Sequence, residues 1–349
     1  MRTINKILII RFSSLGDILL ASPLLRALRK KFKVAQIDFL LKREYSDLVR
    51  YNSHLSNVIE LEDGSFQQLR QLGRYIRQQR YDYIIDIHNS LRSRYLRIVS
   101  LCRQRGVVNK RVIARYALVH WKRNFYKGIV PVAERYLETA KPLGVTGDDG
   151  GLEITVPREI HESVRARLER YHLDRYDRVI GFAPTARHFT KRWPSAHFVE
   201  CGIRLAEYPR SKILVFGGKD DVEYCGDIVH MINSTSGSQI AENLANDFTI
   251  LETAAVMDSC QLVISNDSGL MHLAAARKRR VIAVFGSTVG EFGFFPYGTR
   301  SSVLEKKDLP CRPCTHIGKE KCPAGHFRCM KDISAGDVVS VAEGMLVQS

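Results

Sequence analysis

The sequence lacks any run of eighteen or more apolar residues, so no conventional transmembrane helix is expected. Its first stretch, MRTINKILIIRF, has an apolar core of only five residues before Arg11, which is too short for a secretory signal. It also lacks a Walker A motif and a G-x-G-x-x-G loop, which argues against P-loop NTPases and ordinary dehydrogenases. We therefore expect a protein of the cytoplasm that belongs to neither class.

Acidic residues are missing from one long segment. Residues 92–127 contain eleven Lys or Arg and no Asp or Glu, within a chain of net charge +16. Such a segment predicts an anionic partner, although a plain solvated surface is the alternative. Aromatic side chains interleave with these cations, a mixture that suits a membrane headgroup layer, an anionic glycolipid or a nucleic acid. They are Tyr95, Tyr116, Trp121, Phe125 and Tyr126.

Cysteine is not scarce, but its distribution is uneven. Cys102, Cys201, Cys225 and Cys260 are scattered through ordinary helix or strand patterns, which predicts reduced packing residues. The other four, which stand within twenty residues, are Cys311, Cys314, Cys322 and Cys329. Their C-x₂-C, x₇-C, x₆-C spacing leaves two alternatives open, a structural zinc site and a loop whose thiols simply pack. Disulfides are disfavoured in a cytoplasmic protein.

The chain has 349 residues, which predicts two domains. Continuous apolar runs alternate with helical patterns in both halves, which indicates two doubly wound α/β sheets of buried parallel strands. They join within 145–177, where 144–157 predicts a loop and one short strand. Predicted strands span 6–11, 35–41, 57–61, 81–89, 178–184, 212–218, 260–267 and 280–288. Predicted helices span 17–31, 66–79, 195–208, 220–233 and 269–277, with a last one starting at a capping box of Ser334 and Asp337.

In open α/β sheets, ligands bind beyond the carboxyl ends of the strands, so the segments that follow strands are the candidate sites. The stretch SNDSGLMH at 265–272 predicts an anion site at a helix N-terminus, with Asp267, Ser268 and Gly269 in the turn and His272 on the first turn of the helix. A plain helix cap by Asp267 or Ser268 is the equally weighted alternative.

The loop APTARHFTKRWP at 183–194 follows another strand. It supplies hydroxyls from Thr185 and Thr190 together with cationic side chains, a set that suits a diphosphate held without metal. The cations are Arg187, Lys191 and Arg192. Chance charges in an exposed loop are the alternative. Trp193 is expected to be a core residue or a loop anchor.

The turn RFSSLGD after the first strand carries a carboxylate, Asp17, where nucleotide-binding proteins usually place glycines. Ser13, Ser14 and Gly16 keep this turn open, and the helix N-terminus favours the ionised carboxylate. A helix cap is the structural alternative. An ionised carboxylate in a cleft can instead accept a proton from an incoming hydroxyl, so Asp17 is a candidate general base.

Together, RFSSLGDILLASPLLRALR, KRWP and SNDSGLMHLAAA resemble the ADP-heptose:lipopolysaccharide heptosyltransferases, glycosyltransferase family 9. Further similarity at 81–96 and 134–145 extends this resemblance over nearly the whole chain. It implies the GT-B fold, two Rossmann-like doubly wound domains facing across a cleft. We assign 1–172 to the acceptor domain, 173–333 to the ADP-sugar domain, and 334–349 to a helix packing back on the N-terminal domain.

The resemblance also implies roles for individual residues. Asp17 matches the catalytic base, and Arg92 matches a basic residue near the acceptor or donor phosphates. Ser13, Ser14 and Gly16 form the acceptor-side turn with Asp17. Matching the donor site are Thr185, Arg187, Lys191, Glu223, Asp267, Ser268, Gly269 and His272.

The expected function is therefore an inverting, metal-independent transfer of heptose from ADP-heptose to the lipid A–Kdo inner core of lipopolysaccharide. We expect a monomer, peripheral at the inner face of the cytoplasmic membrane, that needs no cofactor and binds no nucleic acid. Two alternatives stay open, another NDP-sugar glycosyltransferase of GT-B fold and a basic nucleic-acid-binding protein with a Cys-rich zinc element. Incubation with ADP-heptose and core acceptors distinguishes them.

Overall fold

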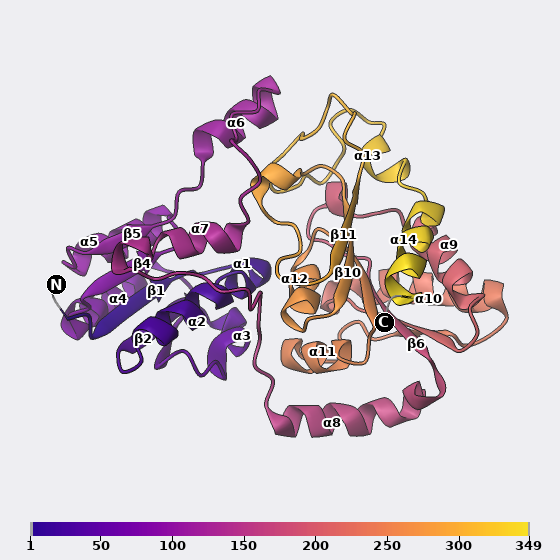
Figure 1. The fold of residues 1–349 in the computed structure, drawn as a ribbon, viewed down its shortest axis with the longest axis horizontal. Helices are drawn as coiled ribbons and strands as arrows, with labels where there is room; N and C mark the ends of the chain where they lie inside the picture. Colours follow the sequence, from indigo (N-terminus) through magenta and orange to yellow (C-terminus); the bar gives the residue numbers. More distant parts are fainter. Residues whose placement is uncertain (1–2, 348–349) are drawn as a thin grey trace. The chain divides into compact units, whose positions relative to one another are not determined.

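The computed structural model describes residues 3–347 and divides into two compact units (Figure 1). The first ends at Val112 and resumes over Val130–Thr155, and the second comprises Ile113–Ile129 and the chain from Val156 onward. The expected boundary at 172/173 is therefore wrong by seventeen residues. Helix α8 (Arg158–Leu168) belongs to the second unit because it packs on α11 (Ile250–Met257), where Arg167 pairs with Glu252 at 2.9 Å.

The first unit is built on a five-stranded parallel sheet in the order β3-β2-β1-β4-β5. Residues 7–10 of β1 are fully buried, as expected for the central strand of a sheet covered on both faces. Strand β5 was not predicted, because its three residues RGV carry no apolar run. The strands are β1 (Lys6–Ile10), β2 (Gln36–Lys42), β3 (Asn57–Leu61), β4 (Tyr83–Asp86) and β5 (Arg105–Val107).

The helices of this unit are α1 (Leu15–Leu19), α2 (Ser22–Lys31), α3 (Asp47–Arg50), α4 (Phe66–Gln79), α5 (Leu91–Val99) and α7 (Val132–Glu138). Helix α4 agrees with the prediction, whereas α3, α5 and α7 were not predicted. The helix expected over 17–31 is two helices, because Pro23 lacks an N–H and its ring collides with the carbonyl four residues earlier. The short strand expected within 144–157 is absent from that described segment, although Leu152 and Ile154 are buried.

The second unit has a six-stranded parallel sheet in the order β11-β10-β9-β6-β7-β8. All four strands predicted for this half are present, while β8 and β11 were missed because their sequences, AEN and SSVLE, are short and polar. The strands are β6 (Arg178–Ala183), β7 (Ser211–Val215), β8 (Ala241–Asn243), β9 (Leu262–Asn266), β10 (Arg280–Phe285) and β11 (Ser301–Glu305).

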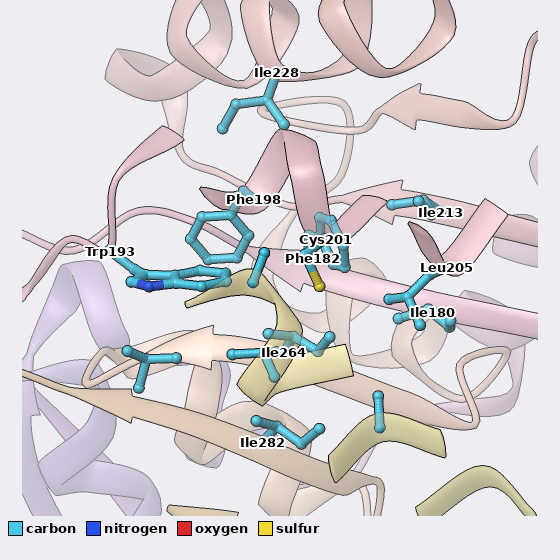
Figure 2. Close-up of a cluster of buried hydrophobic side chains, with 14 of the residues drawn as sticks. Ile180, Phe182, Trp193, Phe198, Cys201, Leu205, Ile213, Ile228, Ile264 and Ile282 are labelled. Atoms are coloured by element: carbon cyan, nitrogen blue, oxygen red, sulfur yellow. The ribbon is translucent and has the colours of Figure 1, made fainter. Parts of the chain in front are cut away.

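The core of the second unit lies between this sheet and its helices (Figure 2). Trp193 is fully buried there, edge-on to Phe198 at a ring separation of 4.9 Å, and its indole N–H donates to the carbonyl of Ile333 at 2.9 Å. The prediction of Trp193 as a core residue is confirmed. Besides α8 and α11, the helices are α6 (Val112–Trp121), α9 (Ser195–Ala206), α10 (Val222–Ser236), α12 (Gly269–Ala276), α13 (Arg328–Lys331) and α14 (Ala335–Val347).

The last helix begins as predicted. The amide of Ser334 donates to Asp337 at 3.0 Å and the amide of Asp337 donates to the Ser334 hydroxyl at 3.1 Å, which completes a capping box. We expected this helix to pack on the N-terminal domain, and that expectation is wrong. Val338 and Ala342 instead belong to the core of the second unit, because the apolar face of α14 covers α9 and β10.

No helix among residues 3–347 is both long enough and apolar enough to span a bilayer.

Candidate active site

In the first unit, the strand order reverses between β1 and β4, since β2 and β3 lie on one side and β5 on the other. A doubly wound sheet binds ligands at such a reversal, beyond the carboxyl ends of the two strands. The segment that follows β1 carries Ser13, Ser14, Gly16 and Asp17, and the segment that follows β4 leads to Arg92 on the first turn of α5. The structure therefore brings the predicted acceptor-side residues to one edge of one sheet.

Asp17 is tightly bound at this edge. Its Oδ2 lies 2.7 Å from the Arg11 guanidinium and 3.0 Å from the Ser14 hydroxyl, and its Oδ1 accepts a hydrogen bond from the Tyr136 hydroxyl at 3.1 Å. The Asp17 side chain keeps 17% of its surface exposed. The carboxylate is therefore held in one orientation and still reachable from solvent.

Several groups set the ionisation state of Asp17. Burial raises the pKa of Asp17, but the Arg11 guanidinium and the hydrogen bonds from Ser14 and Tyr136 outweigh burial and hold the pKa below its usual value. The sequence analysis attributed the ionised state of Asp17 to the helix N-terminus. Helix α1 has only five residues, so we assign the larger part to the cation of Arg11.

The turn after β4 is built on a buried aspartate. Asp86 accepts hydrogen bonds from the amides of His88 at 3.0 Å and Asn89 at 2.7 Å, and it pairs with Arg97 at 2.8 Å. His88 packs against Phe12 with ring centroids 4.7 Å apart and the rings tilted by 56°. Burial, with help from the nearby cations of Arg11 and other residues, lowers the pKa of His88 to about 3, so its imidazole is neutral at physiological pH.

Arg92 is exposed on the first turn of α5. Its guanidinium passes close to Gly64, where a Cβ would stand 2.9 Å from Nη1. Because Gly64 has φ +65°, the backbone conformation favours glycine there. The Arg92 guanidinium therefore lies close to the backbone of Gly64, while the residue as a whole stays exposed.

In the second unit, the strand order reverses between β6 and β9. The segments that follow β6, β9 and β10 meet at one carboxylate, Asp267. Its Oδ2 lies 2.7 Å from Lys191 Nζ, which follows β6, and accepts a hydrogen bond at 2.7 Å from the hydroxyl of Thr288, which follows β10. Asp267 is buried, whereas the Lys191 side chain keeps 16% of its surface exposed.

Helix α12 starts immediately after this carboxylate. Ser268 is its N-cap residue, and among the described residues no side chain caps it by a hydrogen bond. Gly269 is the first helical residue, and His272 is buried one turn further along. The first-turn amides beside Lys191 are the arrangement that binds phosphate groups at helix N-termini.

Three predicted donor residues lie outside this contact group. Thr185 is buried just after β6, Arg187 is exposed in the same loop, and Glu223 is exposed on the first turn of α10, which follows β7. Arg192 lies in the β6 loop too, where its Nε donates to the carbonyl of Ala186 at 2.7 Å. This bond closes the loop on itself.

Comparison with known proteins identifies the chain. The sequence model of glycosyltransferase family 9 (heptosyltransferase) matches residues 69–324. The chain belongs to glycosyltransferase family 9. It is also 27% identical over 359 aligned positions to lipopolysaccharide heptosyltransferase 2 of Escherichia coli strain K12, covering 98% of this chain and 99% of that protein.

Solved structures show the fold of this family 9 glycosyltransferase. A family 9 glycosyltransferase from Veillonella parvula superposes with a TM-score of 0.83 at 23% identity, covering 100% of this chain and 99% of that one. Escherichia coli ADP-heptose lipopolysaccharide heptosyltransferase II superposes with a TM-score of 0.71 at 23% identity, covering 98% and 99%. The two parallel-sheet α/β domains are those of the GT-B class, as predicted.

The Cys-rich segment of the family 9 enzyme contacts the loops that follow β6 and β10. Arg312, between the first two cysteines, donates to the carbonyls of Gly286 at 2.6 Å and Thr288 at 2.7 Å and pairs with Glu305 at 2.8 Å. Thr190 of the β6 loop exchanges two hydrogen bonds with Lys319, at 3.0 and 2.8 Å. The segment thus supports the loops that follow β6 and β10.

The four clustered thiols form no disulfide. All eight cysteines are free, and no three His, Cys, Asp or Glu side chains among residues 3–347 are arranged to hold a metal ion. Burial raises the pKa of the Cys329 thiol to about 12. Both interpretations of the segment, a structural zinc site and packed thiols, stay predictions.

The sequence analysis did not predict four residues of the site. Arg11 and Tyr136 hold Asp17, and Thr288 and Arg312 hold the Asp267 group. Arg11 stands directly after an apolar strand, an unusual place for a cation, and that position was the available signal. Tyr136 and Arg312 meet their partners only through the tertiary fold, so nothing in the local sequence marks them.

Proposed function

We propose that this enzyme transfers heptose from ADP-heptose to the inner core of lipopolysaccharide, with the lipid A–Kdo region as acceptor. The observation that carries the proposal is the near full-length similarity to lipopolysaccharide heptosyltransferase 2, an enzyme named for heptose transfer to lipopolysaccharide. The two strand-order reversals, one with a carboxylate and one with cations and helix amides, supply the groups that such a reaction needs.

The proposed step is a single displacement. The acceptor hydroxyl gives its proton to Asp17 while its oxygen attacks the anomeric carbon, and the bond from that carbon to the ADP oxygen breaks on the opposite face. ADP leaves with the bonding electrons, and the configuration inverts, as it does when water attacks in inverting hydrolases. Arg11 keeps Asp17 ionised at neutral pH, which is the state that can accept the proton.

The departing diphosphate needs positive charge. We assign this task to Lys191 and the first-turn amides of α12, with Arg92 and Arg187 as additional cations that lie exposed at the ends of strands. Thr185 and Ser268 add hydroxyls, and Glu223 is assigned to the nucleoside. Because these cations and amides can balance the charge of the diphosphate, the proposed step uses no metal ion.

We further propose that the enzyme works as a monomer at the cytoplasmic face of the inner membrane, where a lipid-linked acceptor is available. The support for membrane association is its charge, +16 overall, with eleven Lys or Arg and no Asp or Glu in 92–127. An anionic glycolipid and an anionic bilayer surface both match that charge.

The deciding experiment is incubation of the purified enzyme with ADP-heptose and lipid A–Kdo acceptors, with ADP release and product mass as readouts. We expect ADP release that depends on both substrates, and a product heavier by one heptose. Absence of turnover with ADP-heptose, together with turnover of another nucleotide sugar in a donor panel, would replace this proposal by the alternative of a different NDP-sugar transferase. Product anomeric configuration, read by NMR, tests inversion.

A further inference from the structure

The segment Ile113–Ile129, which includes most of α6, exposes an unusual amount of apolar surface for a soluble domain. Ile113 is 82% exposed, Trp121 62%, Phe125 59% and Ile129 55%. Tyr116 is also exposed and contacts the rings of His120 at 4.3 Å and Trp121 at 5.5 Å. So many large, exposed apolar side chains within one short segment indicate an interaction site rather than chance exposure.

The segment is fastened to the second unit by its polar groups. Lys122 Nζ donates to the carbonyls of Pro313 at 2.6 Å and Cys311 at 3.1 Å, and Asn124 donates to Glu291 at 2.9 Å. Tyr126 packs edge-on to Phe292 at 6.5 Å. The exposed apolar residues therefore stand on an anchored support, with Ala117 and Leu118 providing the buried side of the helix.

Positive charge surrounds the apolar residues. Arg115, Arg123 and Lys127 lie in the same segment, and Lys110 and Arg111 directly precede it, with no acidic residue between 87 and 133. Apolar side chains flanked by cations match the two layers of an anionic bilayer surface. The side chains reach the acyl boundary, the aromatic rings take the headgroup level, and the cations pair with lipid phosphates.

A nucleic acid would fit this surface less well. Single-stranded nucleic acids stack their bases on aromatic rings and bind cations through phosphates, but they have no use for exposed aliphatic side chains. Ile113 and Ile129 are aliphatic and are among the more exposed residues of the segment. The combination of aliphatic, aromatic and cationic groups favours a lipid surface.

We propose that the segment Ile113–Ile129 docks the enzyme on an anionic lipid bilayer, with Trp121 and Phe125 inserted at the headgroup level. This inference rests on the proposed function only for the expectation that the acceptor is held in a membrane. The docking itself requires neither ADP-heptose nor acceptor.

The chain provides its own reporter for the test. It has two tryptophans, and Trp193 is fully buried in the core, so a change of emission on adding vesicles reports Trp121. The full-length protein is mixed with vesicles of phosphatidylglycerol and phosphatidylethanolamine, with phosphatidylcholine vesicles as the neutral comparison. We expect a blue shift and co-sedimentation with the anionic vesicles, weakened by salt.

Matched variants locate the docking surface. Trp121→Ser/Phe125→Ser should lower vesicle affinity at least about tenfold, since two apolar side chains leave the interface. Arg123→Gln/Lys127→Gln should lower it severalfold and flatten the salt dependence. Met231→Ser, which removes an exposed apolar residue from α10, should change nothing. Thermal unfolding of each variant checks that it folds.

Three results would overturn the inference. They are an absence of binding to anionic vesicles, equal binding by wild type and Trp121→Ser/Phe125→Ser, and salt-sensitive binding of single-stranded RNA in place of vesicles. The proposed function is tested separately, with wild-type enzyme, ADP-heptose and a deacylated acceptor in the absence of vesicles. Turnover there without vesicle docking refutes only the docking, and docking without turnover refutes only the proposed function.

Discussion

Arg11 and Asp17 form an ion pair of 2.7 Å at the point where the strand order of the first sheet reverses. The same guanidinium donates to the carbonyls of Ser13 and Ile87, each at 2.7 Å. It therefore ties the segment after β1 to the segment after β4 and fixes the carboxylate against both. The geometry of the proposed base depends on a cation that the sequence argument did not single out.

Replacing Asp17 by Asn should leave the fold and ADP binding intact and lower kcat by roughly 10²–10⁴-fold, the usual effect of losing a positioned general base. Steady-state ADP release and ADP titration measure the two quantities. Glu44→Gln, at an exposed acidic position of the same unit, is the matched control and should leave kcat unchanged. Normal turnover by Asp17→Asn would exclude Asp17 as the base.

Replacing Arg11 by Met should move the acid limb of the pH–rate profile upward. Burial raises the pKa of Asp17 and persists in the variant, whereas the opposing effect of Arg11 is lost, so the pKa of Asp17 rises. The wild-type profile should be flat with respect to Asp17 above about pH 5, since its pKa lies below the ordinary value near 3.9. The variant should lose kcat/KM as pH falls through the raised pKa, and Arg11→Lys should restore much of the wild-type profile. If Arg11→Met lowers the rate but leaves the acid limb of the pH–rate profile unshifted, Arg11 does not position and ionise Asp17.

Much of the fold followed from the pattern of apolar residues, and the exceptions have physical causes. The prediction of β3 over 57–61 and of α4 over 66–79 agrees with the structure residue for residue, because both stretches have clear periodicity and polar boundaries. The strands β5, β8 and β11 were missed because a sheet neighbour, rather than their own sequence, makes them strands.

The candidate site was predictable only in part. Asp17, Lys191 and Asp267 were found because they follow strong strands, and parallel sheets place such segments at one edge. The partners of Asp17 were not predicted. Tyr136, for example, lies 119 residues away in the sequence and contacts Asp17 only in the folded chain. Lys191 was predicted as a phosphate ligand, and its pairing with Asp267 could be seen only once β6 and β9 were known to be neighbours.

Replacing Lys191 by Met should weaken ADP binding roughly 10–100-fold, in line with the loss of a charge-assisted contact. The variant also leaves the buried Asp267 carboxylate with the Thr288 hydroxyl but without its cation, which repels a diphosphate nearby. Isothermal titration with ADP measures the effect. Lys219→Met, at an exposed lysine after β7, is the control, and equal losses in both variants would show a non-specific charge effect.

Replacing Arg312 by Met should lower the free energy of unfolding by about 3 kcal/mol or more, since it leaves buried carbonyls and the Glu305 carboxylate without their cation. Only 3% of the Arg312 side chain is exposed. Because the loop that carries Thr288 loses its support, ADP affinity should fall as well. Urea unfolding and ADP titration of the folded fraction test both effects. A destabilised variant with wild-type ADP affinity would show that Arg312 does not act through the loop.

Stability should fall on mild acidification, and His88 should cause a defined share of the loss. Its pKa is about 3 in the folded state and near 6.5 in the unfolded chain, so between these values the unfolded state binds more protons and the free energy of unfolding rises with pH. One such group changes the free energy of unfolding by at most about 1.4 kcal/mol per pH unit, which amounts to about 2 kcal/mol between pH 6.5 and 5.

Other histidines contribute to the total, so the comparison is between wild type and His88→Asn by urea unfolding at pH 7 and pH 5. The variant should lose about 2 kcal/mol less than wild type over that interval. Equal losses in both proteins would mean that the His88 imidazole is protonated in the folded state and that its burial against Phe12 does not keep it neutral.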